Sequence, residues 1–237
     1  MKTKLFTPVE RIDGIAEKRN MAEKHMHLYR YQHAAGILKH MWGSSTKKRI
    51  LDIACGLGYG SRELHTSTGA EVTGVDISEE TIQYAKRHYR SGRDISFKQG
   101  NLTTIPSPDA AYDAVVCYET IEHISHAEGL VAIDELSRVL KPGGTLFIST
   151  PNRIYTYMLQ LMGMKNPFHI YEYMPRELRN ELSHKGFSPV ATYGQSLCFP
   201  ITYYVARHGW LPSKYFYPSR YLPAELSMIA ILQFIKR

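Results

Sequence analysis

The chain has 237 residues, of which 43% are hydrophobic and 22% are charged, and its formal net charge is +7. These values are typical of one globular domain that spans residues 1–237, and they exclude a disordered or collagen-like chain. The three cysteines are too few for a disulfide scaffold, so a cytoplasmic location is expected. The basic residues are spread along the chain, which indicates a solubilising surface and disfavours RNA as a partner.

The N-terminal segment, residues 1–45, is predicted to form a polar helical cap that ends at a Gly-Ser-Ser break. It holds no long apolar run, so neither a secretory signal nor a membrane-spanning segment is expected. Two short buried strands follow at residues 49–53 and 71–76. They are separated by a glycine-rich turn and by a helix that runs to about Thr66.

The rest of the chain continues the alternation of strands and helices. Further strands are predicted at residues 95–99, 112–117, 145–150, 187–193 and 227–235. This order predicts an α/β fold, Rossmann-like and doubly wound, with a mostly parallel sheet and helices on both faces.

Two helices of this region have clear sequence signals. The first carries Leu130, Ile133, Leu136 and Leu140 on one face, and Pro142-Gly143-Gly144 is expected to end it. The second is expected to begin at Pro175 and to end at Gly186.

Residues 195–223 interrupt the rhythm of helix and strand. This stretch is rich in Tyr and Phe and includes Trp210, so it is interpreted as an insertion before the last strand rather than as a linker. Such a segment could cover a substrate pocket, pack against a partner or make a peripheral contact with a membrane surface.

The turn after the first strand has the composition of a nucleotide-binding turn. It runs from Asp52 to Gly60, and its Gly56 and Gly58 let the backbone approach a ligand where a Cβ would collide. Asp76 ends the next strand, at about the spacing at which an acid binds ribose hydroxyls. Asn101 follows the third strand at the same edge of the sheet, where its side chain could reach an adenine.

The acid at the start of this turn favours one cofactor over another. A dinucleotide would place its pyrophosphate beside Asp52, and the carboxylate would repel that anion. S-adenosylmethionine carries a sulfonium and an ammonium instead, and a nearby carboxylate suits both. Ser61 also occupies the third glycine position of the strict G-x-G-x-x-G pattern. An NAD-dependent oxidoreductase is therefore disfavoured.

Taken together, these motifs resemble the class I S-adenosylmethionine-dependent methyltransferases. The resemblance rests on Asp52-Ile-Ala-Cys-Gly56-Leu-Gly58, on Asp76, on Asn101 and on the run Val139-Leu-Lys-Pro-Gly-Gly144, and it extends from about residue 49 to the end. It implies a sheet of seven strands whose last strand is antiparallel.

The resemblance also implies roles for individual residues. Gly56 and Gly58 would line the methionine part of S-adenosylmethionine, Asp76 would bind the ribose hydroxyls, and Asn101 with Leu102 would meet the adenine. The whole cofactor-binding set predicted here is Asp52, Ala54, Gly56, Gly58, Tyr59, Asp76, Ile77, Asn101, Leu102 and Tyr118.

The chain departs from the family pattern at two of these positions. Ala54 replaces a frequent glycine, a change that is expected to need little room, and Asn101 replaces a frequent aspartate. Family members often close an N-terminal helix over the cofactor, so Tyr29, Arg30 or Tyr31 could contact its carboxylate.

The end of the fourth strand supplies the candidates for chemistry. Residues 117–123 resemble the segment with a Glu-x-x-Glu-His metal site in ubiquinone-pathway O-methyltransferases. The predicted catalytic residues are His123, Glu122 and His169, since an acceptor that loses a proton needs a base or a metal. Magnesium could be bound by Glu119 together with Glu122 and His123. Because a Glu-His pair also occurs here in metal-free methyltransferases, no metal ligand is assigned.

The function predicted from these features is methyl transfer from S-adenosylmethionine to a small-molecule acceptor, with oxygen favoured over nitrogen. Sugars, quinones, polyketides and lipid-linked intermediates are the classes considered. The sequence Tyr118-Glu119-Thr120-Ile121 replaces the Asn/Asp-Pro-Pro-Tyr motif of DNA amino-methyltransferases, which excludes that type. An RNA methyltransferase and a non-catalytic S-adenosylmethionine-binding protein are the alternatives, and the oligomeric state is left open.

Overall fold

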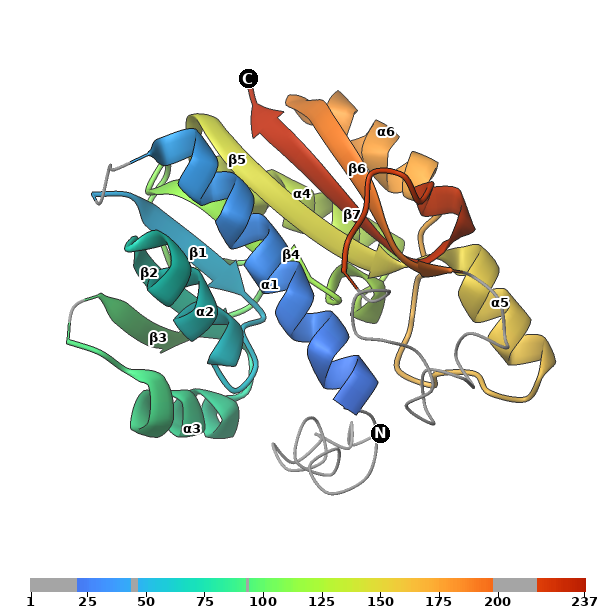
Figure 1. The fold of residues 1–237 in the computed structure, drawn as a ribbon, viewed down its shortest axis with the longest axis horizontal. Helices are drawn as coiled ribbons and strands as arrows, with labels where there is room; N and C mark the ends of the chain where they lie inside the picture. Colours follow the sequence, from blue (N-terminus) through green and yellow to red (C-terminus); the bar gives the residue numbers. More distant parts are fainter. Residues whose placement is uncertain (1–20, 44–46, 93, 198–216) are drawn as a thin grey trace.

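The computed structural model describes residues 21–43, 47–92, 94–197 and 217–237, and these residues build one seven-stranded sheet flanked by helices (Figure 1). The strand order is β3-β2-β1-β4-β5-β7-β6. Strands β1 to β5 pair in parallel, and β7 lies antiparallel between β5 and β6. The strands are β1 (Arg49–Ile53), β2 (Glu71–Asp76), β3 (Ile95–Gln99), β4 (Tyr112–Tyr118), β5 (Leu140–Pro151), β6 (Phe187–Leu197) and β7 (Ser227–Lys236). This topology confirms the predicted fold class, including the antiparallel last strand.

Helices cover both faces of the sheet. They are α1 (Met21–Trp42), α2 (Tyr59–Thr68), α3 (Glu79–Tyr89), α4 (His126–Val139), α5 (Arg153–Leu161) and α6 (Pro175–His184), with short 3-10 turns η2 (Ile121–His123) and η4 (Ala224–Leu226). Buried side chains of α4 and α6 pack on one face, and those of α1, α2 and α5 pack on the other. Among the described residues, no helix has both the length and the apolar character needed to cross a membrane.

Local sequence accounts for where several elements begin. The strand β1 is short because only Ile50 to Ile53 are fully buried, between helices on both sides. Ser78 caps α3 by accepting a hydrogen bond from the backbone N–H of Thr81, and Ser125 and Glu128 form a capping box at the start of α4.

The expected end of α4 is wrong. The helix stops at Val139, and Leu140 already belongs to β5, where it pairs with Tyr112. The next pair in the register joins Ala114 to Thr145, so Pro142-Gly143-Gly144 forms an irregularity inside the strand instead of a helix cap. Gly143 has φ 75°, a left-handed conformation that glycine adopts without strain.

Three other segments extend or qualify the prediction. Residues 21–42 of the expected N-terminal cap at 1–45 form α1, and the rest of that cap apart from Gly43 lies outside the described residues. The strand β6 continues to Leu197, so the expected insertion at 195–223 starts inside it, and residues 198–216 lie outside the described part. The helix α5 was not predicted.

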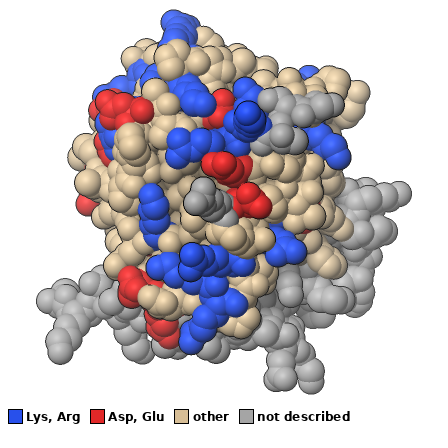
Figure 2. All heavy atoms as spheres, turned by 90° about the vertical axis from the view of Figure 1, so that its left-hand side faces the viewer, with Lys and Arg blue, Asp and Glu red and all other residues tan. Residues whose placement is uncertain are grey.

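Figure 2 shows the side of the molecule that carries the β3 edge of the sheet. Lys and Arg side chains on this face are interspersed with Asp and Glu side chains. This face therefore offers no uniformly basic surface of the kind that a nucleic acid backbone selects.

Candidate functional site

The predicted site residues meet at one edge of the sheet. Because β1, β2 and β3 are parallel and in register, the ends of these strands lie side by side, with Ile53 beside Val75 and Asp76 beside Gln99. The glycine turn after β1, Asp76 at the end of β2 and Asn101 after β3 are therefore neighbours, as in sheets that bind ligands beyond the carboxyl ends of their strands.

The glycine turn is built from left-handed backbone. Ala54, Gly56 and Gly58 have φ of 59°, 53° and 90°. A Cβ on Gly58 would also lie 2.8 Å from the ring of Phe97, so packing as well as backbone conformation requires glycine there. At Ala54, the departure from glycine costs conformational energy rather than room, because a residue with a Cβ is strained at this φ.

Asp52 is fully buried and its two oxygens are bound by protein groups. The hydroxyl of Tyr31 on α1 donates to Oδ1 at 3.1 Å, and the hydroxyl of Ser61 on α2 donates to Oδ2 at 2.6 Å. Burial raises the pKa of Asp52 to about 7, although these two hydrogen bonds oppose the shift. The carboxyl is thus only partly charged near neutral pH, which weakens the expected repulsion of a pyrophosphate, and it joins α1 to the glycine turn.

Close approach of α1 to the turn depends on a second glycine. A Cβ on Gly60 would lie 2.2 Å from the ring of Tyr31. The Tyr31 ring also makes edge contacts with Tyr59, at 5.9 Å between ring centroids, and with Tyr118, at 5.2 Å. Two residues of the predicted cofactor set, Tyr59 and Tyr118, therefore support the helix that covers the turn.

The Asp76 carboxylate faces the same turn. Its Oδ2 accepts a hydrogen bond from the backbone N–H of Gly56 at 3.0 Å, and its Oδ1 accepts one from Ser78 at 3.0 Å. The neighbouring Ile77 is 54% exposed, so an apolar side chain lies at the surface beside the acid. An acid and an exposed apolar group next to a glycine turn form a place suited to a ribose and an aromatic base.

Asn101 and Leu102 have different surroundings. Asn101 is exposed, and its Oδ1 accepts hydrogen bonds from the backbone N–H and the hydroxyl of Thr103. Leu102 is buried in the core on the α4 side of the sheet. Of the two residues expected to meet the adenine, Asn101 is at the surface, while Leu102 anchors the loop.

Arg30 on α1 is the most unusual polar residue of the site. Its side chain is fully buried, and Nη1 lies 2.8 Å from Oε1 of Glu119 and 3.5 Å from the hydroxyl of Ser149. The groups Nε and Nη2 have no hydrogen-bond partner within the part of the chain that the structure describes. A buried guanidinium with unpaired N–H groups is costly, and a bound carboxylate would satisfy it.

Glu119 does not join the cluster in which a metal was considered. Its φ is 49°, and its Oε1 contacts both Arg30 and the hydroxyl of Ser149, the latter at 2.7 Å. A left-handed glutamate at the end of β4 is strained, and such strain is found most often at functional sites.

Glu122 and His123 lie in η2, against the segment that precedes α6. Glu122 is buried, and its Oε2 accepts a hydrogen bond from the hydroxyl of Thr150 at 3.2 Å. Burial, followed by the charge of Glu119, raises the pKa of Glu122 well above its ordinary value. His123 is exposed, and its Nδ1 lies 3.0 Å from the carbonyl oxygen of Phe168.

His169 is oriented by a residue that the sequence did not reveal. Its Nδ1 lies 2.8 Å from Oε1 of Glu172, and its Nε2 lies 2.8 Å from the side-chain amide of Asn166. Glu172 in turn accepts a short hydrogen bond from the hydroxyl of Thr156. The spacing His-x-x-Glu was the available signal, but it acquires meaning only in the folded loop. The rings of His169 and His123 lie 5.2 Å apart, so the structure brings both predicted histidines together.

One potential ligand atom each from Glu122, His123 and His169 lies within 4.8 Å of the others. This donor set has one oxygen and two nitrogens, whereas magnesium prefers oxygen ligands. The residues therefore do not fit the magnesium ion considered from the sequence, and no step of the chemistry below involves a metal.

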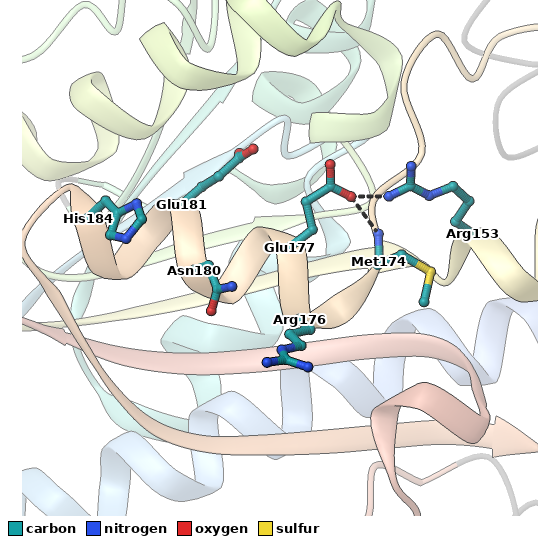
Figure 3. A pocket seen from close by; sticks show the side chains of 7 residues that line it. All are labelled: Arg153, Met174, Arg176, Glu177, Asn180, Glu181 and His184. Carbon is teal, nitrogen blue, oxygen red and sulfur yellow. Dashed lines mark hydrogen bonds and ion pairs between the residues drawn. The ribbon is translucent and has the colours of Figure 1, made fainter.

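A separate hollow of about 520 Å³ lies along α6 (Figure 3). It is lined by Arg153, Met174, Arg176, Glu177, Asn180, Glu181 and His184. None of the predicted site residues lines it. Glu177 is held there by Arg153 and by the backbone N–H of Met174, so its charge is already compensated.

Comparisons with known proteins agree with this geometry. A family model described as a methyltransferase domain matches residues 50–144. A probable S-adenosylmethionine-dependent methyltransferase of Mycolicibacterium smegmatis is 33% identical over 198 residues, which cover 84% of this chain and 71% of that protein. A ubiquinone biosynthesis O-methyltransferase of Idiomarina loihiensis is 34% identical over 131 residues, covering 54% of this chain and 52% of the relative. The chain thus spans about half the length of the latter protein.

Solved structures show the same fold. The structure of magnesium protoporphyrin IX methyltransferase from Synechocystis, with bound SAH, superposes with a TM-score of 0.65 and 19% sequence identity. The superposition covers 98% of each chain. At this level of identity the likeness concerns the fold alone.

Proposed function

Because this chain belongs to the S-adenosylmethionine-dependent methyltransferases, we propose that it methylates an oxygen atom of a small-molecule acceptor held beyond the ends of β4 and β5. S-adenosylmethionine supplies the electrophilic methyl carbon. The observation that carries the choice of oxygen is the pair formed by His169 and Glu172, with 2.8 Å between Nδ1 and Oε1. Such a pair is suited to remove a hydroxyl proton.

The cofactor would be held along the glycine turn. Arg30 binds the methionine carboxylate, which supplies the acceptors that its buried Nε and Nη2 lack among the described residues. Asp76 binds the ribose hydroxyls beside Gly56, and Asn101 reaches the adenine at the surface of the β3 end. This assignment gives Asp52 a positioning role, because its oxygens already accept hydrogen bonds from Tyr31 and Ser61.

The acceptor hydroxyl would be activated by His169. With Nδ1–H donated to Glu172, the Nε2 lone pair accepts a hydrogen bond from the side-chain amide of Asn166, and the acceptor hydroxyl would take the place of that amide before it gives its proton to Nε2. His169 would take the hydroxyl proton as the acceptor oxygen gains the methyl group, and S-adenosylmethionine would supply that group and be released as S-adenosylhomocysteine. The reaction is an in-line displacement, so most of the rate comes from positioning the two reactants.

Glu122 and His123 would serve this arrangement in different ways. The side chain of Glu122 is buried and accepts a hydrogen bond from Thr150, and its backbone carbonyl oxygen accepts hydrogen bonds from the backbone N–H groups of Ile170 and Tyr171. Glu122 therefore fixes the loop that carries His169. His123 lies against the His169 ring at the surface, where it can contact the acceptor.

Two measurements test the proposal. Calorimetry should detect binding of both S-adenosylmethionine and S-adenosylhomocysteine. A panel of hydroxylated sugars, phenols and lipid-linked alcohols should then yield a product that gains the mass of one methyl group on oxygen. A product methylated on nitrogen only, or on RNA only, would overturn the choice of acceptor.

A further inference from the structure

Exposed apolar side chains are concentrated on α5 and on the segment that follows it. Each has between 41% and 71% of its surface exposed, and they are Ile154, Tyr157, Leu161, Met162, Met164, Phe168 and Ile170. We refer to these seven residues as the α5 patch. The other strongly exposed apolar residues on α1, α4 and β6 are single, and single exposed residues are ordinary.

The outer face of helix α5 is apolar, whereas the outer face of a helix at a protein surface in water usually carries charged side chains. Ile154, Tyr157 and Leu161 recur at the i, i+3 and i+7 spacing, so they form one stripe. The opposite side of the helix is packed, with Tyr155 buried in the core on the α1 side of the sheet. Figure 1 places α5 at one end of the molecule, beyond the end of the sheet. The exposed stripe therefore has no packing partner within the described part of the chain.

The α5 patch itself contains no acid. No Asp or Glu occurs between residues 153 and 171, whereas Arg153 and Lys165 lie within this stretch. Arg153 is paired with Glu177, so Lys165 is the cation of this stretch that has no ion pair among the described residues. The side chain of Asn152 bonds the carbonyl oxygens of Ala224 and Glu225, which joins a second segment to the start of α5.

This second segment adds to the same kind of surface. It carries Tyr221 with 98% of its surface exposed, Leu226 with 59%, and the cation Arg220, against one acid, Glu225. Its exposed aromatic and aliphatic groups lie in the segment that Asn152 joins to the start of α5.

We propose that the α5 patch is the surface by which this protein docks onto an anionic lipid bilayer. Apolar side chains of a helix that lies in the interface enter the boundary between headgroups and acyl chains, while Lys and Arg remain with the anionic headgroups. The formal charge of +7 adds long-range attraction to such a surface. A second copy of this chain fits less well, because it would bring the same cations to the same face.

The α5 patch is continuous with the candidate catalytic loop. The carbonyl oxygen of Phe168 lies 3.0 Å from Nδ1 of His123, and the N–H of Ile170 bonds the carbonyl of Glu122 at 2.8 Å. A bilayer bound by the patch would therefore lie beside the acceptor side of the site. The docking surface itself does not depend on the identity of the acceptor.

Vesicle flotation tests the proposal. The full chain should float with vesicles of phosphatidylcholine and phosphatidylglycerol, bind less to phosphatidylcholine alone, and be released by high salt. The double variant Leu161→Asp/Ile170→Asp should bind the anionic vesicles at least roughly tenfold more weakly, since two apolar anchors are lost. The control Val131→Asp changes an apolar residue on α4 that is 49% exposed and lies outside the α5 patch, and it should bind as the unchanged protein does.

Other outcomes would overturn the inference. Equal flotation of the double variant and the unchanged protein would do so. The inference would also be wrong if the unchanged protein does not float but forms a concentration-dependent dimer, and Leu161→Asp converts that dimer to monomer. Thermal unfolding and S-adenosylhomocysteine binding of each variant show that the fold is intact. If the unchanged protein does not bind the cofactor at all, the proposed function is wrong, but the proposal of a docking surface still stands.

Discussion

Replacing Asp52 by Asn should remove a specific dependence of stability on pH. Burial of the side chain raises the pKa of Asp52 from 3.8 to about 7 in the folded protein, against the opposing hydrogen bonds of Ser61 and Tyr31. The unfolded chain releases this proton near the ordinary value, so between those two pH values the folded state holds a proton that the unfolded state has lost. Stability must therefore fall as pH rises through this window.

The size of the effect follows from the shift. The difference between 7 and 3.8 is 3.2, and at 1.36 kcal/mol for each unit the free energy of unfolding falls by about 4 kcal/mol between pH 4 and 7. Below this pH window Asp52 is protonated in both the folded and the unfolded state, and above it the decrease in the free energy of unfolding no longer changes with pH. Asn keeps the shape of the side chain and one of its two acceptor oxygens, and its amide nitrogen can donate to the other hydroxyl, but it does not titrate.

Urea unfolding at intervals across this window measures the prediction. The difference in unfolding free energy between Asp52→Asn and the unchanged protein should grow with pH to about 4 kcal/mol in favour of the variant. Asp113→Asn is the matched control. Burial opposes the shift there, but hydrogen bonds from Lys141 and the backbone of Arg49 lower the pKa of Asp113 below its ordinary value of 3.8. The stability that Asp113 contributes is therefore lost only as pH falls below about 4, and the difference between Asp113→Asn and the unchanged protein should stay constant between pH 4 and 7. Parallel curves for Asp52→Asn and the unchanged protein would refute the reasoning.

Three further predictions concern the site and its turn. Arg30→Lys should weaken S-adenosylhomocysteine binding roughly 10- to 150-fold by calorimetry, because the bidentate contact with the ligand carboxylate is lost. 5′-Methylthioadenosine lacks that carboxylate and should bind as before. An equal loss of affinity for both ligands would contradict the assignment. Glu172→Gln should lower kcat about 100-fold without changing cofactor affinity, because the Glu172 carboxylate acts only through His169. Glu172→Asp should recover part of the lost kcat. An unchanged kcat in Glu172→Gln would exclude that role. Ala54→Gly should raise the free energy of unfolding by about 0.5 kcal/mol, because glycine adopts a φ of 59° without strain. Gly58→Ala should lower the free energy of unfolding by about 2 kcal/mol or more. If denaturation shows that both variants change the free energy of unfolding in the same direction, the turn geometry is contradicted.

The sheet could be predicted from the sequence because its strands are short, buried apolar runs at regular intervals. The end of α4 could not, because Leu140 continues the apolar spacing of the helix and pairing with Tyr112 draws it into β5. The helix α5 was missed for a related reason. Its outer face is apolar, so Ile154 and Leu161 obscure the alternation of polar and apolar residues by which surface helices are recognised.

The cofactor side of the site was easier to predict than the acceptor side. Asp76 and the glycines act where the chain turns, so their spacing alone indicates a role. Arg30 could be named only as one of three candidates, since nothing in the sequence shows that its guanidinium is buried with two N–H groups that lack partners among the described residues. Glu172 depends on a loop that brings His169 and Thr156 to it, and local sequence does not encode that contact.

Helix α1 couples two equilibria, namely the binding of the cofactor and the packing of α1 against the rest of the domain. It carries Tyr31, which holds Asp52, and Arg30, the proposed ligand of the methionine carboxylate. Any population of molecules in which α1 has detached would lower the apparent affinity for the cofactor by the same fraction. By reciprocity, saturating cofactor would hold α1 on the sheet, so the amide hydrogens of α1 would exchange more slowly than they do without cofactor, whereas exchange in α6 would change little.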